Sequence, residues 1–116
     1  MKKEVLKREL FPSGTALFKA GDPSGCAYLI QQGKVEITTE REGETVVLNT
    51  LGAGDLVGEM ALVDAKPRSA TAVAKAATTG IVITPLDLRV RLEKADPLLR
   101  ALVKVLTQKL RKATNG

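Results

Sequence analysis

The chain has 116 residues, of which 44% are hydrophobic and 27% are charged, and its formal net charge is +5. These values predict one soluble globular domain over residues 1–116. The single cysteine excludes an internal disulfide, which fits a cytoplasmic protein or the cytoplasmic domain of a membrane protein. The chain contains no histidine, the commonest general base and metal ligand, so we expect neither an enzyme nor a metal or other cofactor.

The region of about residues 5–84 has the pattern of an all-β protein. Short runs with apolar alternation are separated by glycine- and proline-containing turns, such as Pro12-Ser13-Gly14 and Gly52-Ala53-Gly54-Asp55. The expected strands cover residues 5–11, 15–19, 26–32, 34–39, 45–51, 70–76 and 79–84. These seven ranges with short turns come close to the eight strands of a jelly roll or a small barrel, so we expect about eight strands in all.

The region of about residues 85–114 has a helical pattern. Thr84 followed by Pro85 is a typical helix start, and Asp96 followed by Pro97 repeats it. The first helix is expected over residues 86–94, and the second is expected to run to about residue 113 and to end at Thr114-Asn115-Gly116. The second helix carries an apolar stripe at helical spacing, formed by Leu99, Leu102, Val103, Leu106 and Leu110.

The segment 58–71 carries the strongest indication of function. It places the Glu59 carboxylate and the Arg68 guanidinium nine residues apart, at the two ends of a short connection. A helical turn after Gly58 offers free backbone N–H groups to an anion, and Arg68 has the planar fork that suits a phosphate. Glu59 repels a phosphate but accepts a hydrogen bond from a neighbouring sugar hydroxyl. This combination favours a sugar phosphate with a free hydroxyl as the ligand.

The same segment resembles the phosphate-binding cassette of the cyclic-nucleotide-binding domain family. The family pattern is Phe-Gly-Glu-hydrophobic-Ala-Leu, then a loop, then Pro-Arg-Ser/Ala/Thr-Ala-Thr, and the chain departs from it only at Val57, where phenylalanine is usual. Three further landmarks follow the family's order, namely 18–22, 28–35 and 51–55. The resemblance implies a mainly β fold with flanking helices: an eight-stranded jelly roll, a short phosphate-binding helix and two C-terminal helices.

The resemblance also implies roles for residues of the cassette. Arg68, the backbone N–H groups of Met60 and Ala61, and Ser69 would hold the phosphate. Glu59 would accept the ribose 2′-hydroxyl, and Gly58 would let the backbone come close. An arginine taken alone is more often a surface residue, here in an ion pair with Asp64 or Glu59.

The sequence pattern identifies the residues that contact the base less clearly than those that contact the phosphate. Val57 and Val73 are candidate walls, and Thr71 is a candidate lining residue. In the family, a cover over the base comes from the final helix, and the apolar stripe makes Leu110 the candidate lid, with Lys109 and Arg111 as alternatives. A serine at position 69 fits either cAMP or cGMP, and we favour cAMP.

The leading hypothesis is a cyclic-nucleotide sensor that closes its C-terminal helices over the ligand and signals to an effector outside this chain, such as an ion channel or a kinase. The alternative is the truncated sensor domain of a cAMP-responsive DNA-binding transcription factor. Basic residues near the C-terminus are interpreted as a solvated helix face, so this segment is not expected to bind nucleic acid directly, and it has no apolar run long enough to be embedded in a membrane. A jelly-roll enzyme and a degenerate family member without a ligand are the remaining alternatives.

Overall fold

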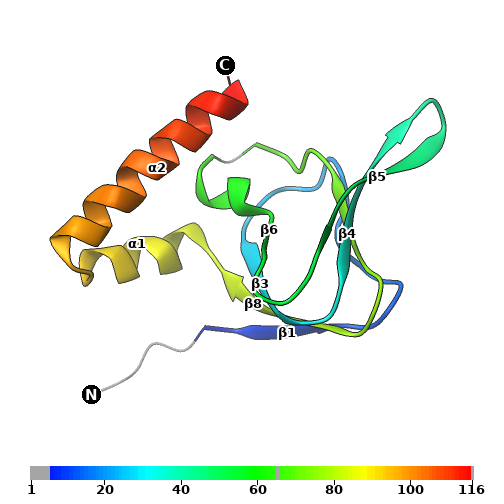
Figure 1. The fold of residues 1–116 in the computed structure, drawn as a ribbon, viewed down its shortest axis with the longest axis horizontal. Coiled ribbons are helices and arrows are strands. Elements are labelled where there is room, and N and C mark those ends of the chain that lie inside the picture. Colours follow the sequence, from blue (N-terminus) through cyan, green and yellow to red (C-terminus); the bar gives the residue numbers. More distant parts are fainter. Residues whose placement is uncertain (1–5, 65, 116) are drawn as a thin grey trace.

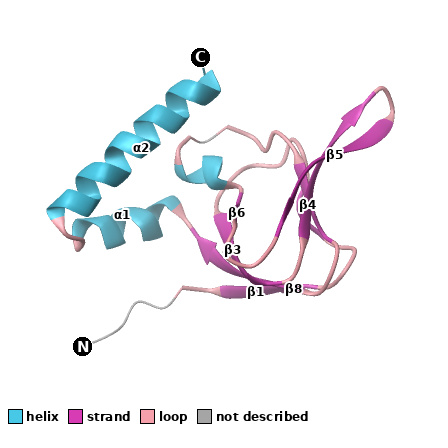
Figure 2. Cartoon of the chain, viewed as in Figure 1, coloured by secondary structure: helices cyan, strands magenta, loops and turns pink. Residues whose placement is uncertain are grey.

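The structure, a computed structural model, describes residues 6–64 and 66–115, and the side chains of all of these except 114 and 115. Two antiparallel sheets of four strands face each other, and two helices follow them (Figures 1 and 2). One sheet has the order β1 (Arg8–Phe11), β8 (Thr78–Ile83), β3 (Ala27–Gln32), β6 (Leu56–Val57), and the other has the order β2 (Ala16–Phe18), β7 (Thr71–Ala74), β4 (Val35–Arg41), β5 (Glu44–Leu51). The predicted mainly β architecture with two C-terminal helices is confirmed.

The observed strands differ from the expected ranges by one to three residues at most of their ends, and one strand, β6, was not expected at all. β6 contains only Leu56 and Val57, which pair with β3, and a strand of two residues is too short to show alternation in the sequence. Three residues of the predicted elements lie outside the described residues. They are Val5 of the first expected strand, Ala65 of the cassette and Gly116 at the expected end of the last helix.

The core lies between the two sheets. Ile30 and Val57 of one sheet pack with Val35, Ala72 and Ala74 of the other, and all of these are almost completely buried. Three aromatic rings belong to this core or pack against it. The ring of Tyr28 meets that of Phe11 edge-on at 5.4 Å between centroids and lies nearly parallel to that of Phe18 at 6.5 Å. Burial raises the pKa of the Tyr28 hydroxyl, so this side chain is neutral at physiological pH.

Both helices begin where the sequence predicts. Helix α1 (Pro85–Glu93) has Thr84 as its N-cap: the Thr84 hydroxyl accepts from the Asp87 N–H at 3.0 Å, and the Asp87 carboxylate accepts from the Thr84 N–H at 2.9 Å. This reciprocal pair is a capping box. Helix α2 (Pro97–Asn115) follows Asp96, whose carboxylate accepts from the Leu98 N–H at 2.8 Å.

Helix α2 lies to one side of the roll rather than on it (Figure 1). Leu99 is 57% exposed and Leu106 is 63% exposed, so the predicted apolar stripe is largely uncovered. The C-terminal end of α2 comes back to the cassette, where Nε and Nη2 of Arg111 both donate to the Val63 carbonyl, at 3.3 and 2.8 Å. Neither helix in the described part of the chain combines the length and the hydropathy that crossing a membrane requires.

Candidate functional site

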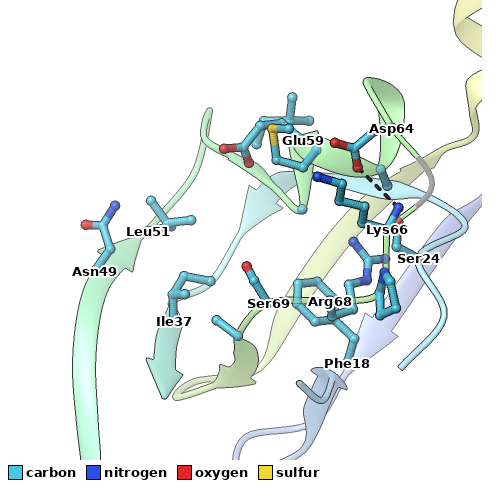
Figure 3. A pocket seen from close by; sticks show the side chains of 16 residues that line it. Phe18, Ser24, Ile37, Asn49, Leu51, Glu59, Asp64, Lys66, Arg68 and Ser69 are labelled. Carbon is cyan, nitrogen blue, oxygen red and sulfur yellow. Dashed lines mark hydrogen bonds between the residues drawn. The ribbon is translucent and has the colours of Figure 1, made fainter. Parts of the chain in front are cut away.

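A pocket of about 380 Å³ opens between the second sheet and the single-turn helix η1 (Glu59–Leu62) with the loop that follows it. This volume lies in the usual range for small-molecule sites. Figure 3 shows the lining side chains. They come from strands β2, β4 and β5, from the loop before β3, and from the segment 56–70: Phe18, Ser24, Ile37, Asn49, Leu51, Leu56, Gly58, Glu59, Met60, Ala61, Asp64, Lys66, Pro67, Arg68, Ser69 and Ala70.

Arg68 is the buried cation of this pocket, with only 8% of the residue exposed. Its Nη2 donates to the Cys26 carbonyl at 2.6 Å, and its Cζ lies 3.9 Å from the centroid of the Phe18 ring. Neither Nε, which is fully buried, nor Nη1 has an acceptor among the described residues. A buried donor without an acceptor is costly, and an anion beside these nitrogens would remove that cost.

The surface ion pair considered for Arg68 is not what the structure shows. No carboxylate of the described residues lies within ion-pair distance of the guanidinium, although Glu59 and Asp64 both line the pocket. Asp64 instead accepts from the Lys66 N–H through Oδ1 at 3.2 Å, and its Oδ2 is buried without a hydrogen-bond partner in the described part of the chain. The positive charge of Arg68 is therefore not neutralised by direct contact with a neighbouring side chain.

Gly58 lies directly against the guanidinium. Its φ is +77°, a left-handed conformation that favours glycine, and a Cβ atom at this position would lie 2.5 Å from Nη1 of Arg68 and 3.2 Å from Cε2 of Phe18. The sequence therefore needs glycine here for two reasons, backbone conformation and space. The second reason links the start of the cassette to the position of Arg68 at its end.

The amides of the cassette turn are only partly available. The Ala61 N–H already donates to the Gly58 carbonyl at 3.0 Å, which closes the single turn of η1. An anion would have to share this N–H or open the turn. The Glu59 side chain is exposed and lines the pocket, so its carboxylate is open to a hydroxyl donor.

The predicted cassette residues line the pocket together, whereas the predicted base-pocket residues are not among its lining residues. The lining contains Gly58, Glu59, Met60, Ala61, Arg68 and Ser69. Val57 is completely buried in the core, and the Thr71 hydroxyl accepts from the Ala20 N–H at 2.9 Å. Val73 alternates with the buried Ala72 and Ala74 of β7 and lies on the opposite face of the strand. Leu110, on α2, is 37% exposed and is not among the lining residues.

Some lining residues were missed by the sequence interpretation. Ile37 and Leu51 provide an apolar wall from β4 and β5, and Asn49 adds a carboxamide to it. Phe18 begins the landmark 18–22, so that motif was a signal for its place beside Arg68. The position of the β4–β5 wall depends on sheet register, which the sequence pattern does not give.

A sequence profile described as the cyclic nucleotide-binding domain matches residues 8–94, three quarters of the chain. The chain belongs to the cyclic-nucleotide-binding domain family. The predicted membership is therefore confirmed, together with the jelly-roll fold of the solved relatives.

This cyclic-nucleotide-binding domain has curated relatives of two kinds. It is 34% identical over 108 residues to the cyclic AMP receptor protein of Thermus thermophilus. This match covers 92% of this chain and 50% of the relative. It is 38% identical over 72 residues to a cAMP-dependent protein kinase regulatory subunit of Yarrowia lipolytica, covering 62% of this chain and 19% of the relative. The domain thus spans half, and about a fifth, of these two proteins.

Solved structures give the same family. The halfsite-occupied form of the EAL enzyme Bd1971 is 31% identical with a TM-score of 0.89, covering 95% of this chain and 99% of that one. Longer chains of Bd1971 have been solved in a cAMP-bound form and a cGMP-bound form, each 32% identical, with TM-scores of 0.71 and 0.73. For each of these two, the match covers 94% of this chain and less than a third of the other.

Proposed function

We propose that this chain is a regulatory sensor for a cyclic nucleotide, with cAMP as the first candidate and cGMP as the second. The observation that carries the proposal is the buried Arg68 guanidinium, which lines the pocket and has two nitrogens without an acceptor among the described residues. A singly charged phosphodiester supplies both the missing acceptors and the opposite charge. The Ser69 hydroxyl, at the exposed edge of the pocket, adds a further donor.

Glu59 gives the site its selectivity for ribose. Its exposed carboxylate lies on η1, at the start of the cassette, and Arg68 lies at the end. A ribose 2′-hydroxyl donates to this carboxylate, whereas the phosphate is repelled by it. A 2′-deoxy nucleotide would leave Glu59 without this donor and would bind more weakly.

The C-terminal helices transmit binding in this proposal. Helix α1 contacts both η1 and α2, and the end of α2 already contacts the cassette through Arg111 and the Val63 carbonyl. The base is covered by α2 in this proposal, with Leu110 as the lid and Lys109 or Arg111 as alternatives. The nucleotide shifts α2 toward the closed position only by its higher affinity for that position.

Two candidate functions differ in the effector that receives the signal. A kinase, or an ion channel, would receive the movement of α2 as a regulatory signal, and the similarity to kinase regulatory subunits supports the first of these. The second candidate function is the sensor half of a cAMP-responsive DNA-binding transcription factor. It is favoured by the similarity to the Thermus receptor, which extends over 92% of this chain. A helix-turn-helix pattern encoded after residue 116 would decide for the second candidate. In both cases the pocket binds its ligand without catalysis.

Titration calorimetry of cAMP and cGMP tests the proposal. Wild type is expected to bind at least one of them, and Arg68→Ala is expected to lose about 2–5 kcal/mol of binding free energy, a tens- to thousands-fold weaker affinity. Arg68→Lys keeps the charge but loses the fork, and is expected to bind more weakly than wild type. Arg8→Ala, at an exposed position on β1, is the matched control and should bind as wild type does.

Because Arg68 is buried, its variants are first checked by thermal unfolding. A second arm needs no substitution near the core: 2′-deoxy-cAMP is titrated into wild type, and cAMP into Glu59→Gln. Both are expected to bind more weakly than cAMP binds wild type. Negligible heat for both cyclic nucleotides with folded wild type would contradict the proposed function.

A further inference from the structure

Helix α2 carries the whole net charge of the chain. Five of the 18 Lys and Arg residues lie on this helix, and none of the 13 Asp and Glu residues does. The other 13 basic residues are balanced by those 13 acidic ones, so the formal net charge of +5 belongs to α2. The five cations are Arg100, Lys104, Lys109, Arg111 and Lys112. A partner that binds this helix is therefore expected to be anionic.

One side of α2 is turned toward α1 and the cassette. Val103 and Thr107 are half-buried on this side. Nη1 of Arg100 donates to the Glu93 carbonyl at the end of α1, at 3.2 Å, and Arg111 donates to the cassette. Positions 100, 103, 107 and 111 follow helical spacing, so they form one stripe along the helix. The opposite side of α2 faces away from these contacts.

That opposite side is apolar and exposed. Leu98, Leu102 and Val105 follow one another at helical spacing, with Leu99 and Leu106 beside them, and between 46% and 67% of each of these residues is exposed. Two exposed lysines continue the row in the last turns. We call the following seven residues the outer face of α2: Leu98, Leu99, Leu102, Val105, Leu106, Lys109 and Lys112.

The outer face combines features that are typical of a helix lying in a membrane interface. Such helices are amphipathic, moderate in overall hydrophobicity and rich in Lys or Arg, and their leucines enter the boundary between headgroups and acyl chains. Figure 1 shows α2 at the margin of the molecule, beside the roll. A flat surface can therefore meet the exposed leucines along the helix. The lysines at one end of the row can keep their amines among anionic headgroups while their stems lie along the apolar surface.

Two other occupants fit this face less well. A second copy of α2 would bring only positive charges, with no carboxylate on the helix to pair with them, and Lys109 lies within the apolar row itself. A nucleic acid would satisfy the cations but would leave the leucines against a charged backbone. The aromatic rings that usually stack on unpaired bases are also absent from α2, since Phe11, Phe18 and Tyr28 all belong to the roll.

We propose that the outer face of α2 docks on an anionic lipid bilayer, with its leucines in the headgroup boundary and Lys109 and Lys112 on the headgroups. The helix then lies along the surface and holds the roll beside it. This inference goes beyond the proposed function and does not rest on it, because no nucleotide is needed for the contact.

Cosedimentation of the full chain with vesicles tests the proposal. Wild type is expected to bind vesicles of equal parts phosphatidylcholine and phosphatidylglycerol, and to bind phosphatidylcholine alone much more weakly. Leu106→Gln, an exposed change between residues of similar helix propensity, is expected to weaken binding to the anionic vesicles about five- to fiftyfold. Leu10→Gln, at the exposed leucine of β1, is the matched control and should bind as wild type does.

The charge contribution is measured with a pair of double variants. Lys109→Gln/Lys112→Gln is expected to bind the anionic vesicles about ten- to thirtyfold more weakly than wild type. Lys19→Gln/Lys34→Gln removes the same charge from exposed positions of the roll and should change binding less than about threefold. Equal losses in the two double variants would show that only the net charge matters, and would overturn the docking of this face.

A fluorescence arm reports the position of the helix directly. The chain has no tryptophan, so Leu106→Trp introduces a single reporter. Its emission is expected to shift to shorter wavelength on anionic vesicles, whereas that of Leu10→Trp is expected to stay unchanged. An unshifted emission from Leu106→Trp in the presence of vesicles that bind the chain would overturn the insertion of the outer face.

The other occupants give different results. A wild-type dimer that Leu106→Gln abolishes, without vesicle binding, would assign the outer face to a second copy and overturn the proposal. Binding to a DNA duplex that the lysine variant weakens and Leu106→Gln does not, again without vesicle binding, would assign it to a polyanion. Wild type that binds cAMP but no vesicles would overturn this inference alone, and wild type that binds vesicles but no cyclic nucleotide would overturn only the proposed function.

Discussion

The guanidinium of Arg68 lies over the ring of Phe18, with Cζ 3.9 Å from the ring centroid. The Cys26 carbonyl accepts from Nη2, so the fork is held by a face contact and by a hydrogen bond. Nε and Nη1 then have no acceptor among the described residues. The pocket is therefore built around an arginine that is positioned before an anion arrives, which lowers the entropy that binding costs.

Phe18→Leu is expected to weaken cAMP binding about two- to thirtyfold, because it removes the cation–π contact that positions the guanidinium. Calorimetry measures the affinity for cAMP, and thermal unfolding measures the stability that Phe18→Leu and its control each lose. The matched control is Phe11→Leu, which alters a buried ring that meets Tyr28 rather than Arg68. Equal loss of affinity in the two variants would argue against a positioning role for Phe18.

Gly58→Ala is expected to displace the guanidinium, because the added Cβ would lie 2.5 Å from Nη1. The loss of a charge-assisted hydrogen bond predicts cAMP binding weaker by about ten- to a hundredfold. Gly14→Ala is a close control: its φ of +89° imposes a similar strain, and nothing lies within 4 Å of its added Cβ. Both variants should unfold more easily by about 1–2 kcal/mol, and only Gly58→Ala should lose affinity.

Much of the local structure could be predicted because it depends on neighbours in the sequence. The helix starts at Thr84-Pro85 and Asp96-Pro97 follow from capping chemistry within three residues. Gly58, Glu59, Arg68 and Ser69 could likewise be placed at one pocket, because they belong to one short segment with a recognisable spacing.

The base side of the pocket could not be predicted in the same way. Whether a strand residue faces the core depends on register and bulges, and a shift of one residue reverses the face. Val73 was expected to be a wall, but the burial of its neighbours Ala72 and Ala74 places it on the other face. Asn49 reaches the pocket through its register with Ile37, a residue twelve positions earlier in the chain.

The capping box of α1 predicts a pH dependence of stability. Hydrogen bonds from the backbone N–H and the hydroxyl of Thr84 hold the pKa of Asp87 below its ordinary value of 3.8. A pKa that is lower in the folded state contributes stability that is complete above the unfolded value and is lost as the pH falls through the folded value. Asp87→Asn should therefore flatten the acid side of the stability curve, measured by denaturant unfolding between about pH 2 and pH 7.

Loss of the cap itself is measured with Thr84→Ala, which is expected to lower the free energy of unfolding at pH 7 by about 0.5–2 kcal/mol. Thr39→Ala, on β4, is the control at a threonine that caps no helix. Equal acid sensitivity of wild type and Asp87→Asn would contradict the capping role of the carboxylate.

The contact between Arg111 and the Val63 carbonyl predicts a restraint on α2. Arg111→Ala should speed hydrogen exchange of the last turns of α2 and the dissociation of cAMP, the latter about two- to tenfold, because the hydrogen bonds at 2.8 and 3.3 Å are lost. Lys112→Ala, the neighbouring exposed cation, is the control. If the two variants exchange and release ligand at the same rates, the Arg111 contact does not restrain the helix.

The central claim is that the phosphate of a cyclic nucleotide meets the two unused nitrogens of Arg68. A crystal structure of the chain with cAMP tests this most directly. The account predicts phosphate oxygens about 2.7–2.9 Å from Nε and Nη1 of Arg68, with the ribose 2′-hydroxyl donating to Glu59. A bound nucleotide whose phosphate lies elsewhere, with Nε of Arg68 still lacking an acceptor, would contradict it.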